Sequence, residues 1–583
     1  MKKIMNSPET MVAEMCHGMI LAHPELEFDP KYKIISRKNQ NQNKVSLISG
    51  GGSGHEPAHA GYVGKGMLDA AVCGDIFASP SQVQVYQAIK NNSGKKGTLL
   101  IVKNYSGDMM NFKNAAYLAK EDGIQVEYVR VDDDIAVQDS LYTVGRRGVA
   151  GTIFVHKIAG AAAEYGYDLK QVKQIAEKAI KNTRSIGFAL SSCTVPAKGS
   201  PTFHLGENEI EYGVGIHGEP GIHREKLINA EELANRMVSA ILKDLLDVEG
   251  DELAVLINGF GSTPVHELYL LNNSVLRILK HKNFKISRCF VGNYMTSIDM
   301  AGASISIIKL DEELKMFLEQ PCETPALCVQ EQRDTINFMD DLSSSSDTLE
   351  ANFKVETPDS FKEIINNSLS LNNIIYIVDR MSECIITNEI PFCELDSHAG
   401  DGDFGMSIAK GFKQLKREWK GILENDTQDI GRFLESCALV IMEHCGGASG
   451  PIWGSAFRAA GRKAYGKSNL SATEIAEMLQ AAVKGIQVTG ERSFGRGAVL
   501  GDKTLIDALI PCANTWSSMA SENADLIDIM KKAAKAALDG AKETKKIVAR
   551  MGRAGTVGER SIGYPDAGAY GLGIIFDDIA SLF

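Results

Sequence analysis

Three aspartates in a glycine-rich segment are the clearest candidates for chemistry in this 583-residue chain. Asp396, Asp401 and Asp403 stand at positions i, i+5 and i+7, with glycines between them. The glycines allow the backbone to bring three carboxylates around one hard cation, and Mg²⁺ prefers oxygen ligands while keeping positions open for phosphate oxygens. An EF-hand needs another spacing and a closing bidentate glutamate. The pattern therefore predicts a magnesium site for phosphate chemistry, with a solvated acidic loop as the alternative.

Glycine-rich segments that could bind phosphate accompany these aspartates in the second half of the chain. Residues 446–451 precede a predicted helix and residues 501–504 open another, and free N–H groups at a helix N-terminus bind phosphate. Segments 552–555 and 558–563 add arginines, whose guanidinium groups pair with phosphate through two hydrogen bonds. An acidic metal loop with several such segments predicts a nucleoside triphosphate and phosphoryl transfer.

The first half of the chain holds further candidates. Residues 50–54 follow an apolar strand and include four glycines, whereas a tight turn needs one or two, so this segment favours a ligand-binding role. Asp108 follows a second predicted strand, and His217 lies in the glycine- and proline-rich segment 213–221, which would fix its imidazole on an exposed turn. Taken singly, Asp108 and His217 are equally compatible with solvated or capping groups.

The segment His55-Glu56-Pro57-Ala58-His59 formally matches the HExxH motif of zinc peptidases. That motif requires a helix, so that both histidines share one face, and proline is tolerated only in a first helical turn. The sequence therefore disfavours zinc hydrolysis. No GxGxxG pattern fits residues 50–55, so a Rossmann dinucleotide site is not supported there.

Composition restricts the class of protein. The formal charge of −12 and the lack of a basic run argue against a nucleic-acid partner. No stretch approaches about 18 uninterrupted apolar residues, which predicts no membrane span. The N-terminus lacks the apolar core of a signal peptide, and the 11 cysteines include no CxxC pair, so free thiols and a cytoplasmic location are expected.

Strand, glycine turn and helix alternate between residues 45 and 320, which predicts two α/β subdomains, and helical periodicity dominates after residue 359. A Ser/Asp-rich stretch between the halves reads as a linker. The fold class expected is an α/β N-terminal half followed by an all-α domain of seven or eight helices. The expected boundaries are an α/β domain at 1–330 (subdomains roughly 1–185 and 186–330), a linker at 331–358 and a helical domain at 359–583. The expected helices are 111–122, 150–182, 228–247, 265–280, 360–388, 405–421, 428–444, 471–487, 503–519 and 524–550.

Together these motifs resemble the dihydroxyacetone kinase family in its fused, ATP-dependent form. The first half carries GGGSGHEP, GDIFASPS, KNYSGD and GIHGEPG, and the second carries GDGDFG, GGASGP, GDKT and GRAG…GERSIG. The resemblance implies a two-part α/β ketose-binding domain, an eight-helix antiparallel barrel that binds ATP, and a homodimer. It also implies phosphorylation of dihydroxyacetone or a close short-chain ketose.

The resemblance also implies roles for individual residues. His217 would form a covalent hemiaminal with the substrate carbonyl, and Asp108 and His55 would supply acid/base groups and hydrogen bonds. The aspartates 396, 401 and 403 would hold two Mg²⁺ ions. The implied substrate-binding residues are Gly52, Ser53, Gly54, His55, Lys103 and Asp108. The implied ATP contacts are Phe404, Gly405, Met406, Ser407, Ala448, Ser449, Gly497, Leu505, Arg553, Asp566, Ala567 and Gly568.

Covalent capture by an imidazole would select ketones over alcohols such as glycerol. A four-carbon ketose such as erythrulose is the alternative substrate, and metal-dependent cyclisation of FAD by the helical domain is the alternative activity. A silent sugar-binding regulator is disfavoured because the aspartates and His217 are present. The sequence departs from the common family pattern at Phe404, Tyr564 and Ala567 near the nucleotide, and at Tyr212 and Val214 near the histidine turn.

Overall fold

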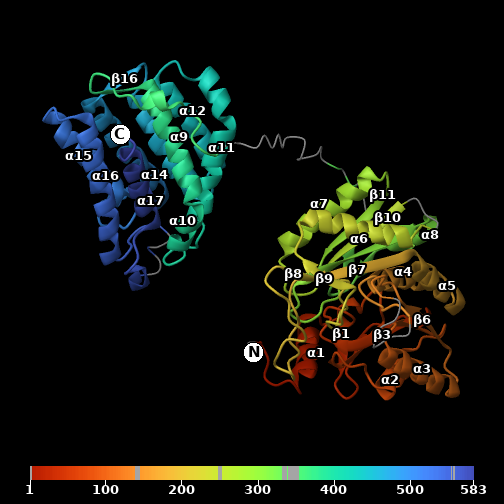
Figure 1. The fold of residues 1–583 in the computed structure, drawn as a ribbon. Coiled ribbons are helices and arrows are strands. Elements are labelled where there is room, and N and C mark those ends of the chain that lie inside the picture. The colour runs from red at the N-terminus through yellow and green to blue at the C-terminus, as the bar shows by residue number, and fades with distance from the viewer. Residues whose placement is uncertain are drawn as a thin grey trace. The chain divides into compact units, whose positions relative to one another are not determined.

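The computed structural model divides the chain into two compact units, Met1–Phe338 and Met339–Phe583 (Figure 1). It describes residues 3–137, 145–246, 252–330, 336, 338, 353–552, 555 and 558–583. Most of the predicted linker, 331–358, lies outside the described residues. No helix in the described part of the chain is long and apolar enough to cross a membrane.

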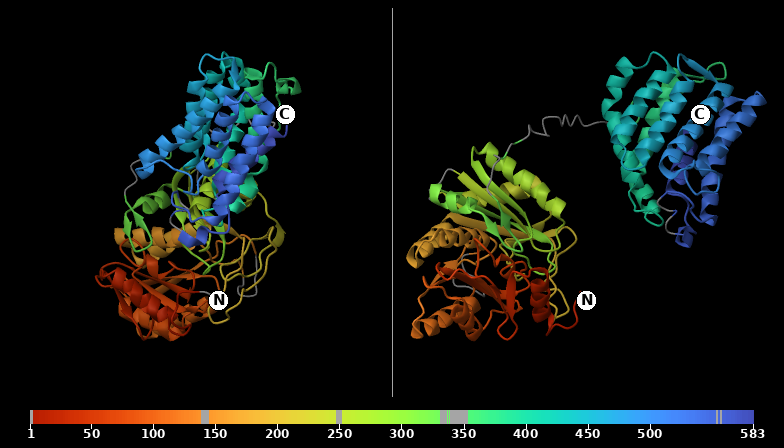
Figure 2. Two further views of the ribbon diagram at one scale, coloured as in Figure 1. Left: turned by 90° about the vertical axis from the view of Figure 1, so that its left-hand side faces the viewer. Right: turned by 180° about the vertical axis from the view of Figure 1, so that it is seen from behind.

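The N-terminal unit contains two six-stranded sheets (Figure 2). The first has the order β1-β2-β4-β3-β5-β6, in which β4, β3, β5 and β6 are parallel neighbours and β2 is antiparallel to both β1 and β4. Its central strands are apolar and buried along their length, as expected when helices cover both faces of a sheet. The strands are β1 (Leu26–Asp29), β2 (Ile34–Arg37), β3 (Ser46–Ser53), β4 (Ala70–Ile76), β5 (Thr98–Lys103) and β6 (Val126–Val131).

The second sheet has the order β11-β10-β12-β7-β8-β9, with β10 and β11 parallel and the other neighbours antiparallel. All of β7 belongs to this sheet, so the chain enters the second sheet at Thr183. The strands are β7 (Thr183–Ala189), β8 (Glu209–Tyr212), β9 (His223–Lys226), β10 (Glu252–Gly259), β11 (Lys285–Gly292) and β12 (Gly302–Leu310).

Helices form three layers around these sheets (Figure 1). Helices α2 and α3 cover the outer face of the first sheet, α4 and α5 lie between the sheets, and α6 and α7 cover the outer face of the second. Helix α4 is apolar almost all round because both of its sides are buried. The helices are α1 (Met11–Ala22), α2 (Gln82–Asn92), α3 (Ser106–Glu121), α4 (Thr152–Tyr165), α5 (Leu169–Asn182), α6 (Ala230–Asp244), α7 (Val265–His281) and α8 (Glu312–Glu319).

The glycine run at 50–54 differs from the expected loop, because β3 continues through Ser53. A Cβ atom on Gly50 would lie 2.5 Å from the carbonyl oxygen of Val72, and one on Gly52 would lie 2.7 Å from the backbone nitrogen of Ala78. Gly50 and Gly52 therefore allow two backbone segments to pack in direct contact, so that β3 ends beside the segment that follows β4.

Helix α3 begins at Ser106, five residues before the expected start at 111. Asp108 consequently lies in the first turn of the helix and not in a loop. A carboxylate is favourable there because the first helical N–H groups carry partial positive charge. The KNYSGD motif is therefore the junction of β5 and α3.

The C-terminal unit is helical, which confirms the fold class. It contains nine α-helices, α9 to α17, among its described residues, so the expected number of eight is not confirmed. The short strands β15 (Ser368–Ser370) and β16 (Asn469–Ser471) form a two-stranded antiparallel sheet. The helices are α9 (Leu371–Thr387), α10 (Glu389–Asp396), α11 (Phe404–Asn425), α12 (Ile430–His444), α13 (Ser449–Lys463), α14 (Ala472–Phe494), α15 (Ile506–Ser521), α16 (Leu526–Glu543) and α17 (Ala567–Ala580).

Candidate active site

The imidazole rings of His55 and His217 meet in the N-terminal unit, although 162 residues separate them in the sequence. Their Nε2 atoms are 3.1 Å apart, and Nδ1 of His55 lies 2.8 Å from the carbonyl oxygen of Thr296. His55 is fully buried, whereas the His217 side chain is 21% exposed. The rings of Phe77 and Tyr105 pack against this pair. His217 is therefore the member of the pair that a small molecule can reach.

A buried carboxylate orients His217. Oε1 of Glu219 lies 2.8 Å from His217 Nδ1, and Oε2 accepts the backbone N–H of His217 at 2.8 Å. Burial alone would raise the pKa of Glu219, but the His217 imidazole and the Arg147 guanidinium lower it to about 2. Gly215 is required here, since a Cβ atom would lie 2.1 Å from Glu219 Oε2. The turn around His217 thus holds an ionised carboxylate at the Nδ1 edge of the ring.

The partners of the ring nitrogens determine where the protons lie. The Thr296 carbonyl can only accept, so His55 Nδ1 carries a hydrogen, and burial lowers the pKa of His55 well below its usual value, which leaves a lone pair on Nε2. The Glu219 carboxylate likewise places a hydrogen on His217 Nδ1. A hydrogen bond between the two Nε2 atoms needs one further hydrogen. A hydrogen held there lies within reach of either ring, beside the Glu219 carboxylate.

Lys103 and Asp108 are buried beside the histidine pair. A Cβ atom on Gly51 would lie 3.5 Å from both the Lys103 ammonium and the Asp108 carboxylate, and the ammonium lies 5.3 Å from the centre of the Tyr105 ring. Burial raises the pKa of Asp108, while the nearby ammonium opposes that rise. A carboxylate in this setting is a stronger proton acceptor than an exposed one.

The remaining predicted ketose-binding residues make contacts within the N-terminal unit. Gly52 packs against the segment after β4. The Ser53 hydroxyl donates to the Gly74 carbonyl at 2.7 Å, and the Gly54 N–H donates to the Glu56 carboxylate at 2.9 Å. These polar groups are thus already paired within the protein.

The HExxH segment does not bring its two histidines together. His55 faces His217, whereas Nδ1 of His59 lies 2.9 Å from Nε2 of His156. The segment precedes a short 3₁₀ turn at Ala60–Tyr62 and is not an α-helix. The second histidine pair is buried beneath the first one.

Glu219→Gln is expected to weaken ketose capture, because a neutral amide cannot balance the charge on the His217 ring. We expect the dissociation constant for dihydroxyacetone to rise by about 10- to 100-fold, in the range found for groups that orient a reactive histidine. Isothermal titration calorimetry of the full chain measures this change. Glu211→Gln is the matched control, because Glu211 is equally buried and binds Gly221 N–H and Arg224 instead. Equal affinities in Glu219→Gln and wild type would contradict the role of Glu219.

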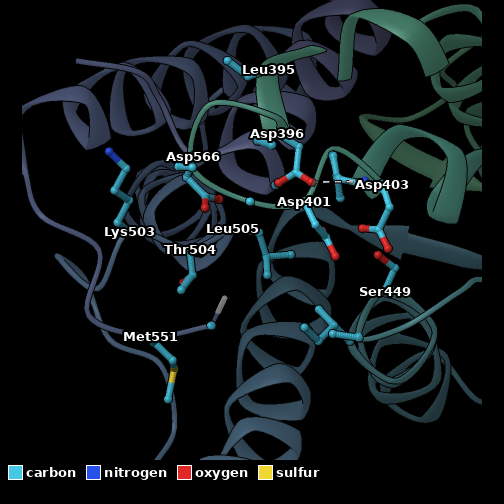
Figure 3. Close-up of a pocket in the computed structure, with 18 of the residues that line it drawn as sticks. Leu395, Asp396, Asp401, Asp403, Ser449, Lys503, Thr504, Leu505, Met551 and Asp566 are labelled. Atoms are coloured by element: carbon cyan, nitrogen blue, oxygen red, sulfur yellow. Dashed lines mark hydrogen bonds between the residues drawn. The ribbon is translucent and has the colours of Figure 1, made fainter. Parts of the chain in front are cut away.

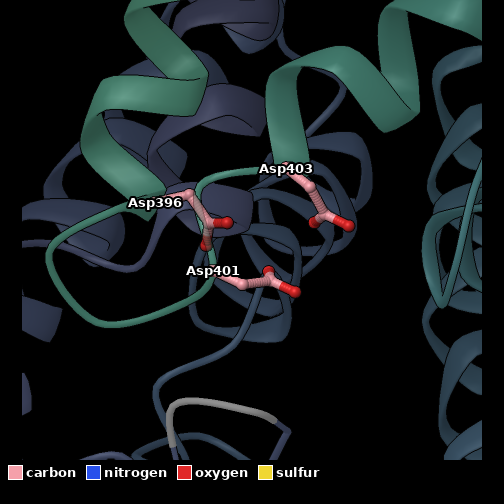
Figure 4. A group of neighbouring side chains, drawn as sticks. All are labelled: Asp396, Asp401 and Asp403. Carbon is pink, nitrogen blue, oxygen red and sulfur yellow. The ribbon is translucent and has the colours of Figure 1, made fainter. Parts of the chain in front are cut away.

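The three aspartates converge in the C-terminal unit (Figure 4). Asp396 is the last residue of α10, and Asp401 and Asp403 lie in the segment that leads into α11; one oxygen from each of the three lies within 4.8 Å of the others. Gly402 has a left-handed φ of +77°, and a Cβ atom on Gly400 would lie 2.3 Å from an Asp396 oxygen. Burial raises the pKa of Asp396, and the charges of Asp401 and Asp403 raise it further. This cluster of partly exposed carboxylates fits the oxygen-ligand preference of Mg²⁺.

A cavity opens beside these carboxylates (Figure 3). Its volume is about 190 Å³. The N-termini of α11, α13 and α17 face it, so helix-terminal N–H groups surround a space next to the candidate metal ligands. Seven of the residues predicted to contact ATP line it: Phe404, Ala448, Ser449, Leu505, Asp566, Ala567 and Gly568.

The other residues predicted to contact ATP are not among those that line this cavity. A Cβ atom on Gly405 would lie 2.0 Å from the Glu389 carbonyl oxygen, so this glycine packs α11 against α10. Met406 is exposed, Ser407 is buried, and Gly497 packs against Gln487. Arg553 lies outside the described residues.

Asp566 caps α17, since its carboxylate accepts the N–H of Ala569 at 2.8 Å. It is half-buried in the wall of the cavity, and desolvation there raises its pKa to about 7. A carboxyl group in a cavity wall whose pKa is strongly shifted is a candidate functional group.

No P-loop is expected from the sequence, although residues 461–468 formally match the pattern GxxxxGK[ST]. A P-loop joins a strand to the N-terminus of a helix. Here Gly461 lies inside α13 and packs against α12, and the match ends in the turn before β16. Lys467 forms an ion pair with Glu474. This segment is therefore a helix end and not a phosphate-binding loop.

Both units of the chain resemble known protein domains. Residues 17–326 match the Dak1 domain, and residues 398–581 match the DAK2 domain. The chain is 50% identical over 328 residues to the dihydroxyacetone-binding subunit DhaK of PTS-dependent dihydroxyacetone kinase 1 from Listeria innocua, which covers 56% of this chain and 100% of that protein. It is 32% identical over 591 residues to the L-erythrulose kinase of Pectobacterium atrosepticum, covering 100% of this chain and 96% of that protein.

A solved structure of similar fold is the dihydroxyacetone kinase from C. freundii in complex with AMP-PNP and Mg²⁺. The TM-score is 0.59 at 31% sequence identity, with 100% of this chain and 99% of that chain covered. Both domain matches occur in one chain, and the similarity extends over its whole length. The chain belongs to the dihydroxyacetone kinase family.

Proposed function

We propose that this chain transfers the γ-phosphoryl group of ATP to a terminal hydroxyl group of dihydroxyacetone or a closely related short-chain ketose. The observation that carries this proposal is the His55–His217–Glu219 arrangement, with 3.1 Å between the ring nitrogens and 2.8 Å to the carboxylate. A kinase that acted on a simple alcohol would have no use for an oriented nucleophilic nitrogen. The acidic cavity of the C-terminal unit supplies the second requirement, a place for a nucleotide.

Capture of the ketose follows from the positions of the protons. The proton between the two Nε2 atoms moves onto His55, and the freed lone pair of His217 Nε2 adds to the carbonyl carbon. As the N–C bond forms and the C=O π bond breaks, His55 returns the proton to the carbonyl oxygen, which becomes a hydroxyl group. The His217 ring keeps its Nδ1 hydrogen and its positive charge beside Glu219.

Phosphoryl transfer then uses Asp108 as the acceptor of the proton that the terminal hydroxyl group loses. Asp396, Asp401 and Asp403 would hold two Mg²⁺ ions, which neutralise charge on the phosphate oxygens when bound. The seven lining residues named above, together with Gly405, Met406, Ser407, Gly497 and Arg553, are proposed to contact ATP. We assign ketose binding to residues 1–330 and nucleotide binding to 359–583, in a cytoplasmic homodimer.

The substrate class is tested by a screen with Mg·ATP in which ADP formation is recorded. Dihydroxyacetone and the two enantiomers of erythrulose are expected to be phosphorylated, and glycerol is not, because it has no carbonyl group for His217. The erythrulose kinase among the relatives supports including four-carbon ketoses. A parallel reaction with FAD and Mn²⁺ and without ketose tests the lyase alternative. Phosphorylation of glycerol at the rate of dihydroxyacetone would contradict the proposal.

A further inference from the structure

The GDKT motif contains a lysine whose ammonium group is turned away from the site of phosphate chemistry. Lys503 follows the loop at 495–502 and precedes α15, and it is 1% exposed. Its Nζ donates to the carbonyl oxygens of Tyr564 at 2.8 Å, Ile547 at 3.3 Å and Ser561. Figure 3 shows the ammonium at the side of the cavity away from Asp401 and Asp403.

An ammonium group has three hydrogens and no acceptor. The three carbonyl groups therefore use its full capacity to donate, and none is left for a phosphate oxygen. Segment 501–504 is expected to bind phosphate through its helix-terminal N–H groups, and the sequence gives the lysine itself no role. In the structure this lysine is a junction, because its ammonium group ties the start of α15 to Ile547 and to segment 561–564.

The segment held by Lys503 leads directly into the wall of the cavity. Ser561 and Tyr564 precede Asp566, which caps α17 and lines the cavity with Ala567 and Gly568. A second bond supports the same position, because the Asp566 N–H donates to the Thr544 hydroxyl at 2.9 Å. The start of α17 also packs closely against the residue before α15, since a Cβ atom on Gly568 would lie 3.3 Å from the Leu505 Cβ atom.

The same segment also reaches the metal loop. The ring of Tyr564 stacks on the ring of His398, with 3.8 Å between centroids and 13° between planes. His398 lies between Asp396 and Asp401 in the sequence. The carbonyl group of Tyr564 is held by Lys503 and its ring by the metal loop, so a displacement of this segment moves both walls of the cavity.

We infer that Lys503 is a positioning residue of the nucleotide site, which ties residues 561–568 to the start of α15 and binds no phosphate oxygen itself. This inference rests on the proposed function. Lys503→Met keeps the length of the side chain and removes all three donors. The dissociation constant for Mg·ATP is expected to rise on the order of 10-fold or more, and the Mg²⁺ concentration for half-maximal activity is expected to rise with it. The affinity for dihydroxyacetone is expected to stay unchanged.

Calorimetric titration of the full chain with Mg·AMP-PNP and with dihydroxyacetone tests the inference. Lys157→Met is the matched control, because Lys157 is also 1% exposed and donates to a backbone carbonyl, that of Phe317 at 2.8 Å, in the other unit. It is expected to lower the melting temperature without changing nucleotide affinity. Lys503→Arg is expected not to restore affinity, since a planar guanidinium cannot donate to three carbonyl groups around one nitrogen.

Three outcomes would overturn the inference. One is wild-type nucleotide affinity in Lys503→Met, and another is a loss of kcat with unchanged affinity, which would mean that the charge acts on the transferring phosphoryl group. If Lys503→Met does not fold, Thr544→Val decides, because it removes the hydroxyl group that accepts the Asp566 N–H and so loosens the same segment. Unchanged nucleotide affinity in Thr544→Val is the third outcome. Failure of the wild-type chain to bind Mg·AMP-PNP would refute the proposed function itself, which separates the two claims.

Discussion

Asp401→Ala abolishes phosphoryl transfer while the chain still binds ketose: this is the largest effect that we expect. One oxygen from each of the three aspartates lies within 4.8 Å of the others, so removal of one carboxylate leaves an incomplete ligand set for a divalent cation. Loss of metal-based charge stabilisation costs several kcal/mol in the transition state, which corresponds to about 1000-fold or more in kcat/KM. Steady-state assay with dihydroxyacetone and Mg·ATP measures the loss.

The control for this prediction is Asp528→Ala in the same unit. Asp528 is exposed in the first turn of α16 and pairs with Lys532, so its removal is expected to leave turnover intact. Calorimetry with dihydroxyacetone is expected to give wild-type affinity for both variants. Wild-type turnover in Asp401→Ala would refute the assignment of the metal site.

The second large effect is expected for His217→Ala, which removes the nucleophilic nitrogen. Covalent capture then cannot occur, and the ketose is held by hydrogen bonds alone. We expect its dissociation constant to rise by about 100-fold or more, because a covalent bond and its orientation of the terminal hydroxyl group are both lost. Mass spectrometry of the intact protein with dihydroxyacetone reports the adduct directly.

Nucleotide affinity provides a second readout for this variant. It is expected to stay unchanged in His217→Ala, because the nucleotide cavity is lined by residues of the C-terminal unit. His223→Ala is the matched control, since this histidine is exposed on β9 and contacts Glu225. A ketose adduct on His217→Ala, or its absence on His223→Ala, would contradict the role of the imidazole.

Much of the fold could be predicted from apolar patterning, because helices and strands bury residues at regular intervals. The glycine run before His55 could not be placed by pattern. Gly50 and Gly52 lack side chains because the backbone at Val72 and Ala78 occupies that space, and this contact exists only after β3 and β4 pair. The start of α3 at Ser106 was likewise missed, since glycine and aspartate after a strand are also typical of a loop.

For the candidate site as well, local motifs could be predicted from the sequence, whereas contacts that depend on tertiary packing could not. Spacing alone favoured a metal loop at 396–403, because those residues are neighbours in the chain. The meeting of His55 and His217 depends on the packing of the second sheet against the first, and residue types gave no sign of it, so only the family resemblance indicated their roles. Glu219 received no role from the sequence, although its place two residues after His217 on a glycine turn was the available signal.

The structural role of Lys503 could not be predicted from the sequence either. The GDKT motif favoured phosphate binding at the start of a helix and gave the lysine no role of its own, because the use of an ammonium group is decided by the acceptors around it. The carbonyl groups of Ile547, Ser561 and Tyr564 come from a distant part of the chain. No local pattern at residues 501–504 reports their approach.

The most direct test of the central claim follows the phosphorus atom itself. The full-length chain is incubated with dihydroxyacetone, Mg²⁺ and ATP labelled in its γ-phosphoryl group, and the products are separated. Appearance of the label on the ketose, in equal amount to ADP and without any second protein, is the predicted result. Label that remains on ATP, or that is released only as inorganic phosphate, would contradict the account.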